Sequence, residues 1–107
     1  MAEDNTRSWT ANRSLGRGMV PGRLELSPTH VTFEPGRVAR RTVGLRFSVR
    51  LEHIAAVGVA PGAGRWLGGG KRERLVLTLG DGSEVLFVVP ELEPAVAAIR
   101  AALPRRA

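Results

Sequence analysis

The sequence contains no cysteine and no tyrosine, one lysine and two histidines among its 107 residues. Without cysteine, the chain forms no disulfide and offers no thiolate as a metal ligand or nucleophile. The N-terminal segment lacks the apolar core of a signal peptide, and no apolar run approaches the ~18 residues that cross a bilayer. We therefore expect a cytoplasmic protein, either soluble or peripheral on a membrane, with no cofactor.

Arginine is the residue in excess. The chain has fifteen arginines and a net charge of +6, while hydrophobic residues make up 43% of it, enough to drive the folding of one domain. A positive excess attracts phosphate-rich partners such as nucleic acid or anionic lipid. A GC-rich genome that uses arginine as its surface cation would give the same composition, so charge alone does not identify the partner.

Alternating apolar and polar residues predict seven short strands. The clearest pattern covers residues 42–51, and Gly80-Asp81-Gly82 predicts a hairpin turn between the last two strands. Pro21-Gly22 predicts an earlier turn. Residues 1–13 show no periodicity, and we expect them to be flexible. The seven strands are predicted at residues 14–20, 22–27, 30–33, 42–51, 54–59, 74–79 and 83–89.

A helix is predicted at residues 91–103, followed by a basic tail at 104–107. Pro94 is tolerated in the first turn, where backbone N–H groups lack helical partners. The helix has one apolar stripe, made by Leu92, Val96, Ile99 and Leu103. Strands joined without crossover helices must pair antiparallel. The sequence therefore predicts a mainly β domain at residues 14–103, with two curved sheets forming a partly open barrel that the helix caps.

The order of these motifs resembles the GRAM and bacterial pleckstrin-homology-like domains. The resemblance starts with a glycine, an alternating strand, a turn and a strand that ends in aromatic-x-Pro, at residues 22–35. It continues through residues 49–57, the hairpin at 75–89 and the helix at 90–103. Where the family's helix often carries a tryptophan, this chain has Val96. The resemblance implies a PH-like fold and a non-catalytic binding module.

Residues suited to catalysis are scarce. His53 is next to Glu52, but adjacent residues of an extended chain point to opposite faces, so we expect no acid–base pair. His30 and His53 alone do not make a metal site. The run at residues 68–72 lacks the Ser or Thr, the spaced glycine and the following helix of a phosphate-binding loop. We expect no enzymatic activity and no small-molecule substrate.

Two groups of cations are candidates for binding anions or a membrane. In phosphoinositide-binding relatives the first–second and third–fourth strand loops line the headgroup pocket, and the second of these corresponds to residues 35–41. Trp66 lies between cations in a glycine-rich loop, where it could anchor on a membrane or fold back over the barrel. The candidate residues are Arg37, Arg40, Arg41, Arg65, Trp66, Lys71 and Arg72.

The last hairpin is apolar in both of its phases. Val76, Leu86 and Val88 occupy the phase expected to face outward. A strand with two apolar faces is usually covered on both, so either the segment around Trp9 or a second copy of the protein should cover this face. The sequence favours a module that binds a protein partner or itself through the last hairpin. Its alternatives are a peripheral membrane adaptor and, less favoured because aromatic residues are few, a nucleic-acid-binding protein.

Overall fold

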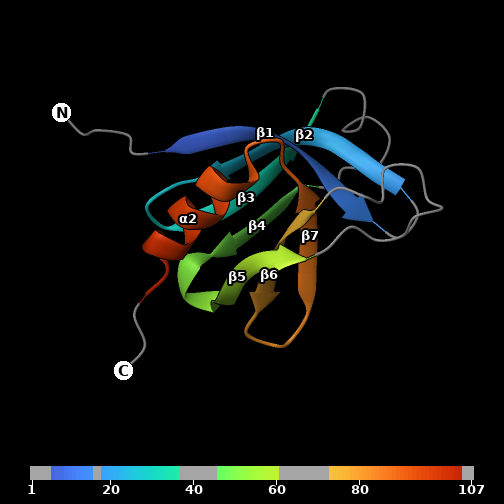
Figure 1. Cartoon of the computed structure of the whole chain (residues 1–107). Coiled ribbons are helices and arrows are strands. Elements are labelled where there is room, and N and C mark those ends of the chain that lie inside the picture. The colour runs from blue at the N-terminus through green and yellow to red at the C-terminus, as the bar shows by residue number, and fades with distance from the viewer. Residues whose placement is uncertain (1–5, 16–17, 37–45, 61–72, 105–107) are drawn as a thin grey trace.

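The structure is a computed structural model that describes residues 6–15, 18–36, 46–60 and 73–104. Seven antiparallel strands and one C-terminal α-helix make up the fold (Figure 1). The strands are β1 (Arg7–Leu15), β2 (Gly18–Leu26), β3 (His30–Pro35), β4 (Phe47–Arg50), β5 (Ile54–Ala60), β6 (Arg74–Leu79) and β7 (Glu84–Val88). A short 3-10 turn, η1 (Leu51–His53), joins β4 to β5, and the helix is α2 (Leu92–Ala102). The predicted mainly β class with a closing helix is confirmed.

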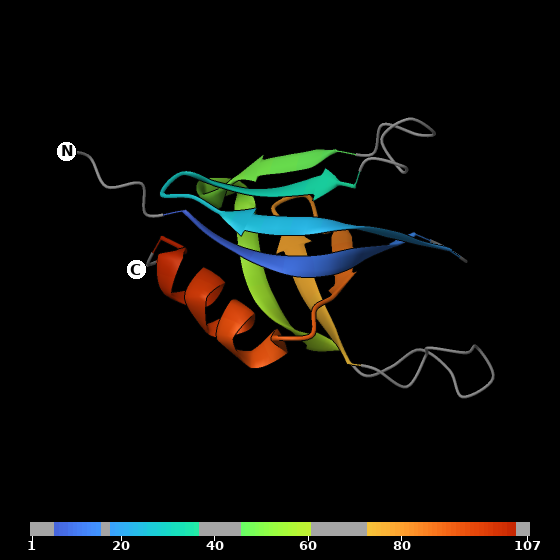
Figure 2. The same ribbon diagram turned by 90° about the horizontal axis from the view of Figure 1, so that it is seen from above.

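All seven strands belong to one sheet, in the order β4-β3-β2-β1-β7-β6-β5. The sheet bends so that β5–β7 cross β1–β4 at a steep angle, and α2 lies beside the open side (Figure 2). Strand β1 joins the two halves, because it pairs with β2 along its whole length and with β7 over Asn12–Ser14. The two curved sheets that the sequence predicts are therefore the two halves of one continuous sheet. Within the described residues β4 and β5 are not paired with each other, so the sheet is not closed into a barrel.

The N-terminal segment is the largest correction to the sequence analysis. Residues 7–13, expected to be flexible, form most of β1 at the centre of the sheet. Trp9 and Ala11 point into the core, with only 8% and 1% of their surface exposed. Two apolar residues in seven gave too weak a pattern, and the segment becomes a strand because β2 pairs with it. The folded unit thus starts before residue 14, while residues 1–5 lie outside the described residues.

Pro21-Gly22 is not a turn but lies inside β2. Gly22 pairs with Ala11 on one side and with Pro35 on the other. The register between β2 and β3 ends at Gly22, so Pro21 has a strand partner only in β1. A proline is tolerated at such a position because one side of the backbone needs no ladder donor.

The core fills the concave side of the bent sheet. Its centre is aromatic: the ring of Phe87 is 5.6 Å from that of Phe33 and 6.2 Å from that of Phe47, between centroids. Phe33 and Phe87 are fully buried. Burying a side chain of this size contributes about 1.5–3 kcal/mol, so these rings stabilise the junction between the two halves of the sheet.

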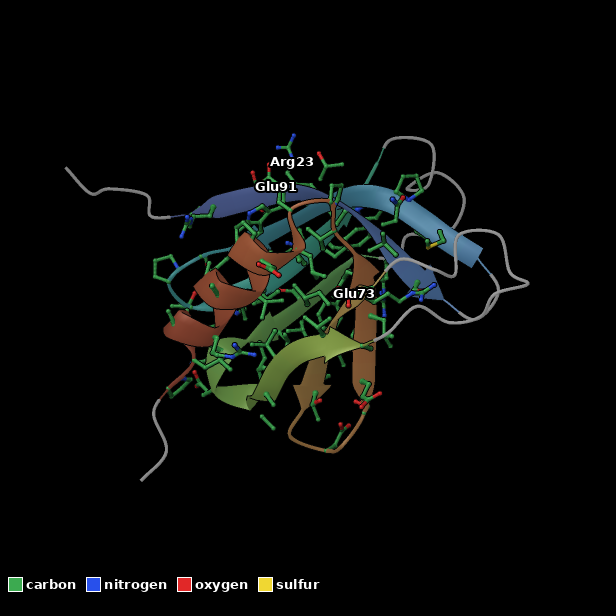
Figure 3. The ribbon with its side chains drawn as sticks, viewed as in Figure 1. Arg23, Glu73 and Glu91 are labelled. Atoms are coloured by element: carbon green, nitrogen blue, oxygen red, sulfur yellow. The ribbon has the colours of Figure 1, made fainter. Side chains whose placement is uncertain are left out.

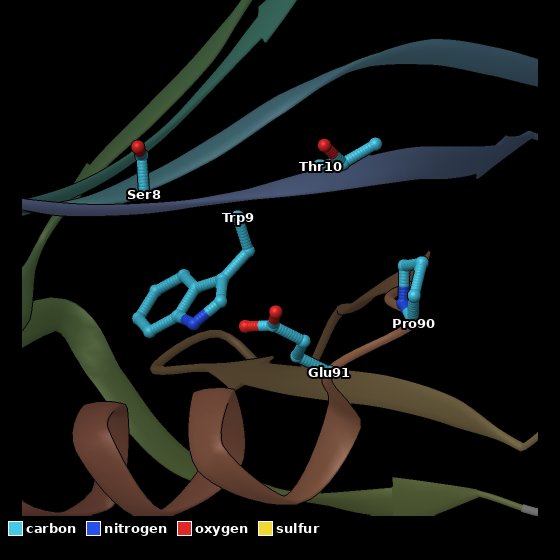
Figure 4. A pocket seen from close by; sticks show the side chains of 5 residues that line it. All are labelled: Ser8, Trp9, Thr10, Pro90 and Glu91. Carbon is cyan, nitrogen blue, oxygen red and sulfur yellow. The ribbon is translucent and has the colours of Figure 1, made fainter.

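Helix α2 covers the core from the open side and packs against β5 and β6. Ala95, Val96 and Ile99 are buried, and Leu92 and Leu103 pack half-buried at its ends. The predicted apolar stripe is therefore confirmed. The domains that the sequence resembles often have a tryptophan at the helix position that Val96 occupies here. In this chain an indole lies beside the helix as well, but it belongs to Trp9 of β1 and lies between β1 and α2 (Figure 4).

The hairpin between β6 and β7 has the predicted turn. Gly82 has a φ of 91°, which glycine adopts without strain, and its N–H donates to the Leu79 carbonyl. The hydroxyl and the N–H of Ser83 donate to Oδ1 of Asp81 at 2.6 and 2.9 Å. These bonds hold the pKa of the Asp81 carboxyl below its usual range.

The lowered pKa makes a prediction about acid stability. A carboxylate with a depressed folded-state pKa stabilises the fold above its unfolded pKa of about 3.9, and this contribution is lost as pH falls through the folded pKa. Thermal unfolding should show Asp81→Asn less stable than the wild type near pH 7, with the difference shrinking near pH 2. In a Ser83→Ala background the difference near pH 7 should be smaller. An equal difference at both pH values would contradict this role for the charge.

Candidate functional site

The convex face of β2–β4 is polar. Register places Arg23 of β2 beside Glu34 of β3, and Arg46, just before β4, forms an ion pair with Glu34. Thr32 and Ser48 share a hydrogen bond of 3.1 Å one step along the same strands. Charges of alternating sign on neighbouring strands keep this half of the sheet compatible with water. Figure 3 shows Arg23 projecting outward from the sheet.

The convex face of β5–β7 has an apolar row at its middle, between the pair Thr78 and Glu84 on one side and Arg74 on the other. Val76 and Leu86 are directly opposite each other on β6 and β7, and both are half-buried. On the neighbouring edge strand, the same face carries Ala56 and Gly58, which add no charge. We call Val76, Leu86 and the small residues of β5 beside them the apolar patch. The sequence predicted the apolar phase of the hairpin, and the register brings its two central side chains together.

Val88 lies on the same face of β7 but is only 4% exposed. Its partner on β1 is Asn12, and continuing the β6–β7 register by one residue places Arg74 opposite Val88 on the other side. Arg74 is itself only 8% exposed, and its Nε has no hydrogen-bond partner among the described residues. A partner protein could therefore reach Val76 and Leu86 but not Val88.

The segment around Trp9 does not cover the apolar patch. The Trp9 side chain points to the concave side of β1 and belongs to the same core cluster as Leu24 and Phe33. The sequence analysis named the Trp9 segment and a second copy of the protein as possible covers of this face, and the structure excludes the Trp9 segment.

A cleft of about 420 Å³ lies between β1 and the start of α2. Trp9 forms its floor, Ser8 and Thr10 border it on β1, and Pro90 and Glu91 form the opposite wall (Figure 4). The Glu91 carboxylate points into the cleft toward the indole. Sequence analysis missed this feature because its walls come from opposite ends of the chain.

One end of the core is closed by a cation. The guanidinium carbon of Arg13 lies 5.2 Å from the ring centroid of Phe47. Burial lowers the pKa of Arg13 from its ordinary value, since desolvation disfavours the charged form. The pair is typical of a cation–π contact and gives Arg13 a structural role at the edge of the core.

The two histidines have separate surroundings. Nδ1 of His30 lies 2.7 Å from the Thr29 hydroxyl, and His53 is exposed in η1 with its carbonyl accepting from the Gly80 N–H. Among the described residues no three His, Asp or Glu side chains gather as a metal site. The absence of enzymatic activity stays a prediction.

The candidate anion- and membrane-binding residues lie outside the described residues. This applies to Arg37, Arg40, Arg41, Arg65, Trp66, Lys71 and Arg72, and to residues 105–107 of the basic tail. Membrane and nucleic-acid binding through them stay predictions. In the part of the chain that the structure covers, no helix has the length and hydrophobicity to cross a membrane.

Comparison with known proteins supports the fold alone. No family model matches the sequence, and no curated protein matches it. Among solved structures, the chain is similar to the crystal structure of the C-terminal domain of an unknown protein from Leishmania infantum, with a TM-score of 0.70 and 11% sequence identity. The match covers 90% of this chain and 80% of that one. Similarity at this identity shows a shared fold and carries no function.

Proposed function

We propose that this protein is a non-catalytic interaction module of the PH-like type that associates with a second copy of itself through the apolar patch. The observation that carries the proposal is the contrast between the two halves of one convex sheet face. Across β2–β4 this face has charged pairs, whereas the middle row of β5–β7 has Val76, Leu86 and small residues, with Thr78 and Glu84 at its border. An apolar row inside a polar border is typical of a surface that another protein covers.

The identity of the partner follows from what remains to cover the patch. The Trp9 segment is in the core, which leaves the second copy from the two covers that the sequence offered. An apolar row on a sheet face suits an isologous contact, because the same side chains can pack against themselves across a two-fold axis. The resemblance to GRAM and bacterial PH-like domains supports a binding role for such a fold.

Substitution of Leu86 tests the proposal. Leu86→Glu places a charge at the centre of the patch and should weaken self-association roughly tenfold or more, measured by light scattering over a concentration series. Val59→Glu is the matched control, since Val59 is 47% exposed on β5 and belongs to the other face of that strand, opposite Leu75. It should leave the dissociation constant unchanged.

Leu86 is half-buried, so the fold of each variant must be checked by circular dichroism. Val76→Thr is a milder second variant, because threonine keeps the β-branched shape and adds one hydroxyl. It should weaken the dimer while preserving the melting transition. A wild type that is monomeric at all accessible concentrations would overturn the proposal.

A further inference from the structure

The edge of β1 that faces α2 is paired with another strand over only part of its length. Strand β1 pairs with β2 from Arg7 to Leu15, but its register with β7 covers only Asn12–Ser14. Within the described chain, residues 7–11 therefore have a strand neighbour on one side and none on the other. Backbone groups of a strand point alternately to the two sides, so this stretch presents free donors and acceptors toward the cleft.

Pro90 explains why the pairing between β1 and β7 stops. Strand β7 ends at Val88, and two residues later Pro90 has no N–H to continue the ladder with β1. Glu91 then begins the turn into α2. The chain leaves the sheet at this point, and a cleft of about 420 Å³ replaces the missing pairing.

The cleft offers contacts other than backbone groups. The Trp9 indole provides an apolar floor, and Glu91 places a carboxylate on the opposite wall (Figure 4). The Glu91 side chain makes no capping hydrogen bond to the helix, and the ion pairs of the described residues, Arg46–Glu34 and Arg50–Glu52, do not involve it. Among the residues that line the cleft, Glu91 is thus the charged one, and its carboxylate has no ion pair among the described residues.

We propose that this cleft binds an extended segment of another polypeptide, which adds to the free edge of β1 and places a lysine or arginine against Glu91. The main chain would pair with residues 7–11, as in strand addition to other exposed sheet edges. One side chain of the segment would lie over Trp9, and the cation would meet the Glu91 carboxylate. The proposal concerns a different surface from the apolar patch and does not depend on self-association.

The test uses the full-length chain, labelled with ¹⁵N, and the acetylated and amidated peptide Thr-Val-Arg-Val-Thr as probe. Binding should shift the amide signals of residues 7–11 and Glu91. A peptide with glutamine in place of the arginine should bind about two- to fivefold more weakly, the size expected for one exposed charge pair. Glu91→Gln should remove this difference. Glu93→Gln is the matched control, because Glu93 is exposed on α2 outside the cleft, and should retain it.

The backbone part of the proposal has its own signature. N-methylation of alternate peptide amides removes the donors that point to one side only. Methylation in one phase should abolish binding, and methylation in the other should leave it nearly unchanged. Equal effects of both phases, equal affinity for the arginine and glutamine peptides, or no shifts of residues 7–11 at millimolar peptide would overturn the proposal. So would shifts at residues 7–11 caused merely by deleting residues 105–107, since the chain's own tail would then be the occupant.

Discussion

Gly22→Ala is expected to destabilise the domain by about 3 kcal/mol, a large share of the stability of a small protein. Gly22 lies where β1, β2 and β3 meet, and a Cβ there would collide with the Glu34 carbonyl oxygen and lie 2.9 Å from Cα of Pro35. Both are backbone atoms, which cannot rotate away as a side chain can. Chemical denaturation of the variant and the wild type measures the difference.

Gly58→Ala is the matched control for this substitution. Gly58 also lies inside a strand, β5, but a Cβ there meets no atom within 4 Å. Alanine restricts the unfolded chain more than glycine does, so Gly58→Ala should leave stability unchanged or raise it by up to ~1 kcal/mol. Equal losses from both substitutions would contradict the close approach of β2 and β3 at Gly22.

Phe87→Ala is expected to cost about 3–5 kcal/mol, the largest loss expected of any single substitution proposed for this domain. Phe87 is fully buried between Phe33 and Phe47, and its strand joins the two halves of the sheet through β1. Removing the ring leaves a cavity at that junction, because both neighbours are held by their own strands. Thermal or urea unfolding followed by circular dichroism gives the loss.

An exposed apolar residue serves as the control for Phe87. Val59, on the edge strand β5, is 47% exposed, so Val59→Ala removes little buried area and should cost less than about 1 kcal/mol. Phe87→Leu should fall between the two, since leucine fills part of the space. A Phe87→Ala variant as stable as Val59→Ala would show that the aromatic cluster is not the centre of the core.

The elements predicted best from the sequence carry their own local signals. The hairpin of β6 and β7 has an apolar residue at every second position and an Asp-Gly turn, and α2 has a predicted stripe in which Val96 and Ile99 are buried. In both, the pattern repeats several times within one element, so the type of each element can be assigned from its own residues. The positions of these elements needed no knowledge of distant partners.

Strand β1 could not be predicted in the same way. Its polar residues hide the alternation of Trp9 and Ala11, and its stability as a strand depends on partners in β2 and β7. Missing β1 also moved the expected turn to Pro21-Gly22. The signal that could have located it is the pair Trp9-x-Ala11 itself, two apolar residues in strand phase ahead of a glycine.

The candidate surfaces were predictable to different extents. The phase of Val76 and Leu86 could be assigned from alternation alone, whereas the burial of Val88 depends on which residues lie beside it in β1 and β6. The cleft at Trp9 and Glu91 was beyond sequence analysis, because it arises where β7 leaves the sheet at Pro90. The point at which two strands stop pairing can be located only once the register between them is known.

Self-association through the apolar patch is tested most directly by intermolecular NOEs in a mixed sample of ¹³C-labelled and unlabelled protein. We predict NOEs between the methyl groups of Val76 and Leu86 of one copy and the same groups of the other. These signals should vanish on Leu86→Glu and persist on Val59→Glu. Intermolecular NOEs that connect other faces of the sheet, or none in a sample that sediments as a dimer, would contradict the proposed interface.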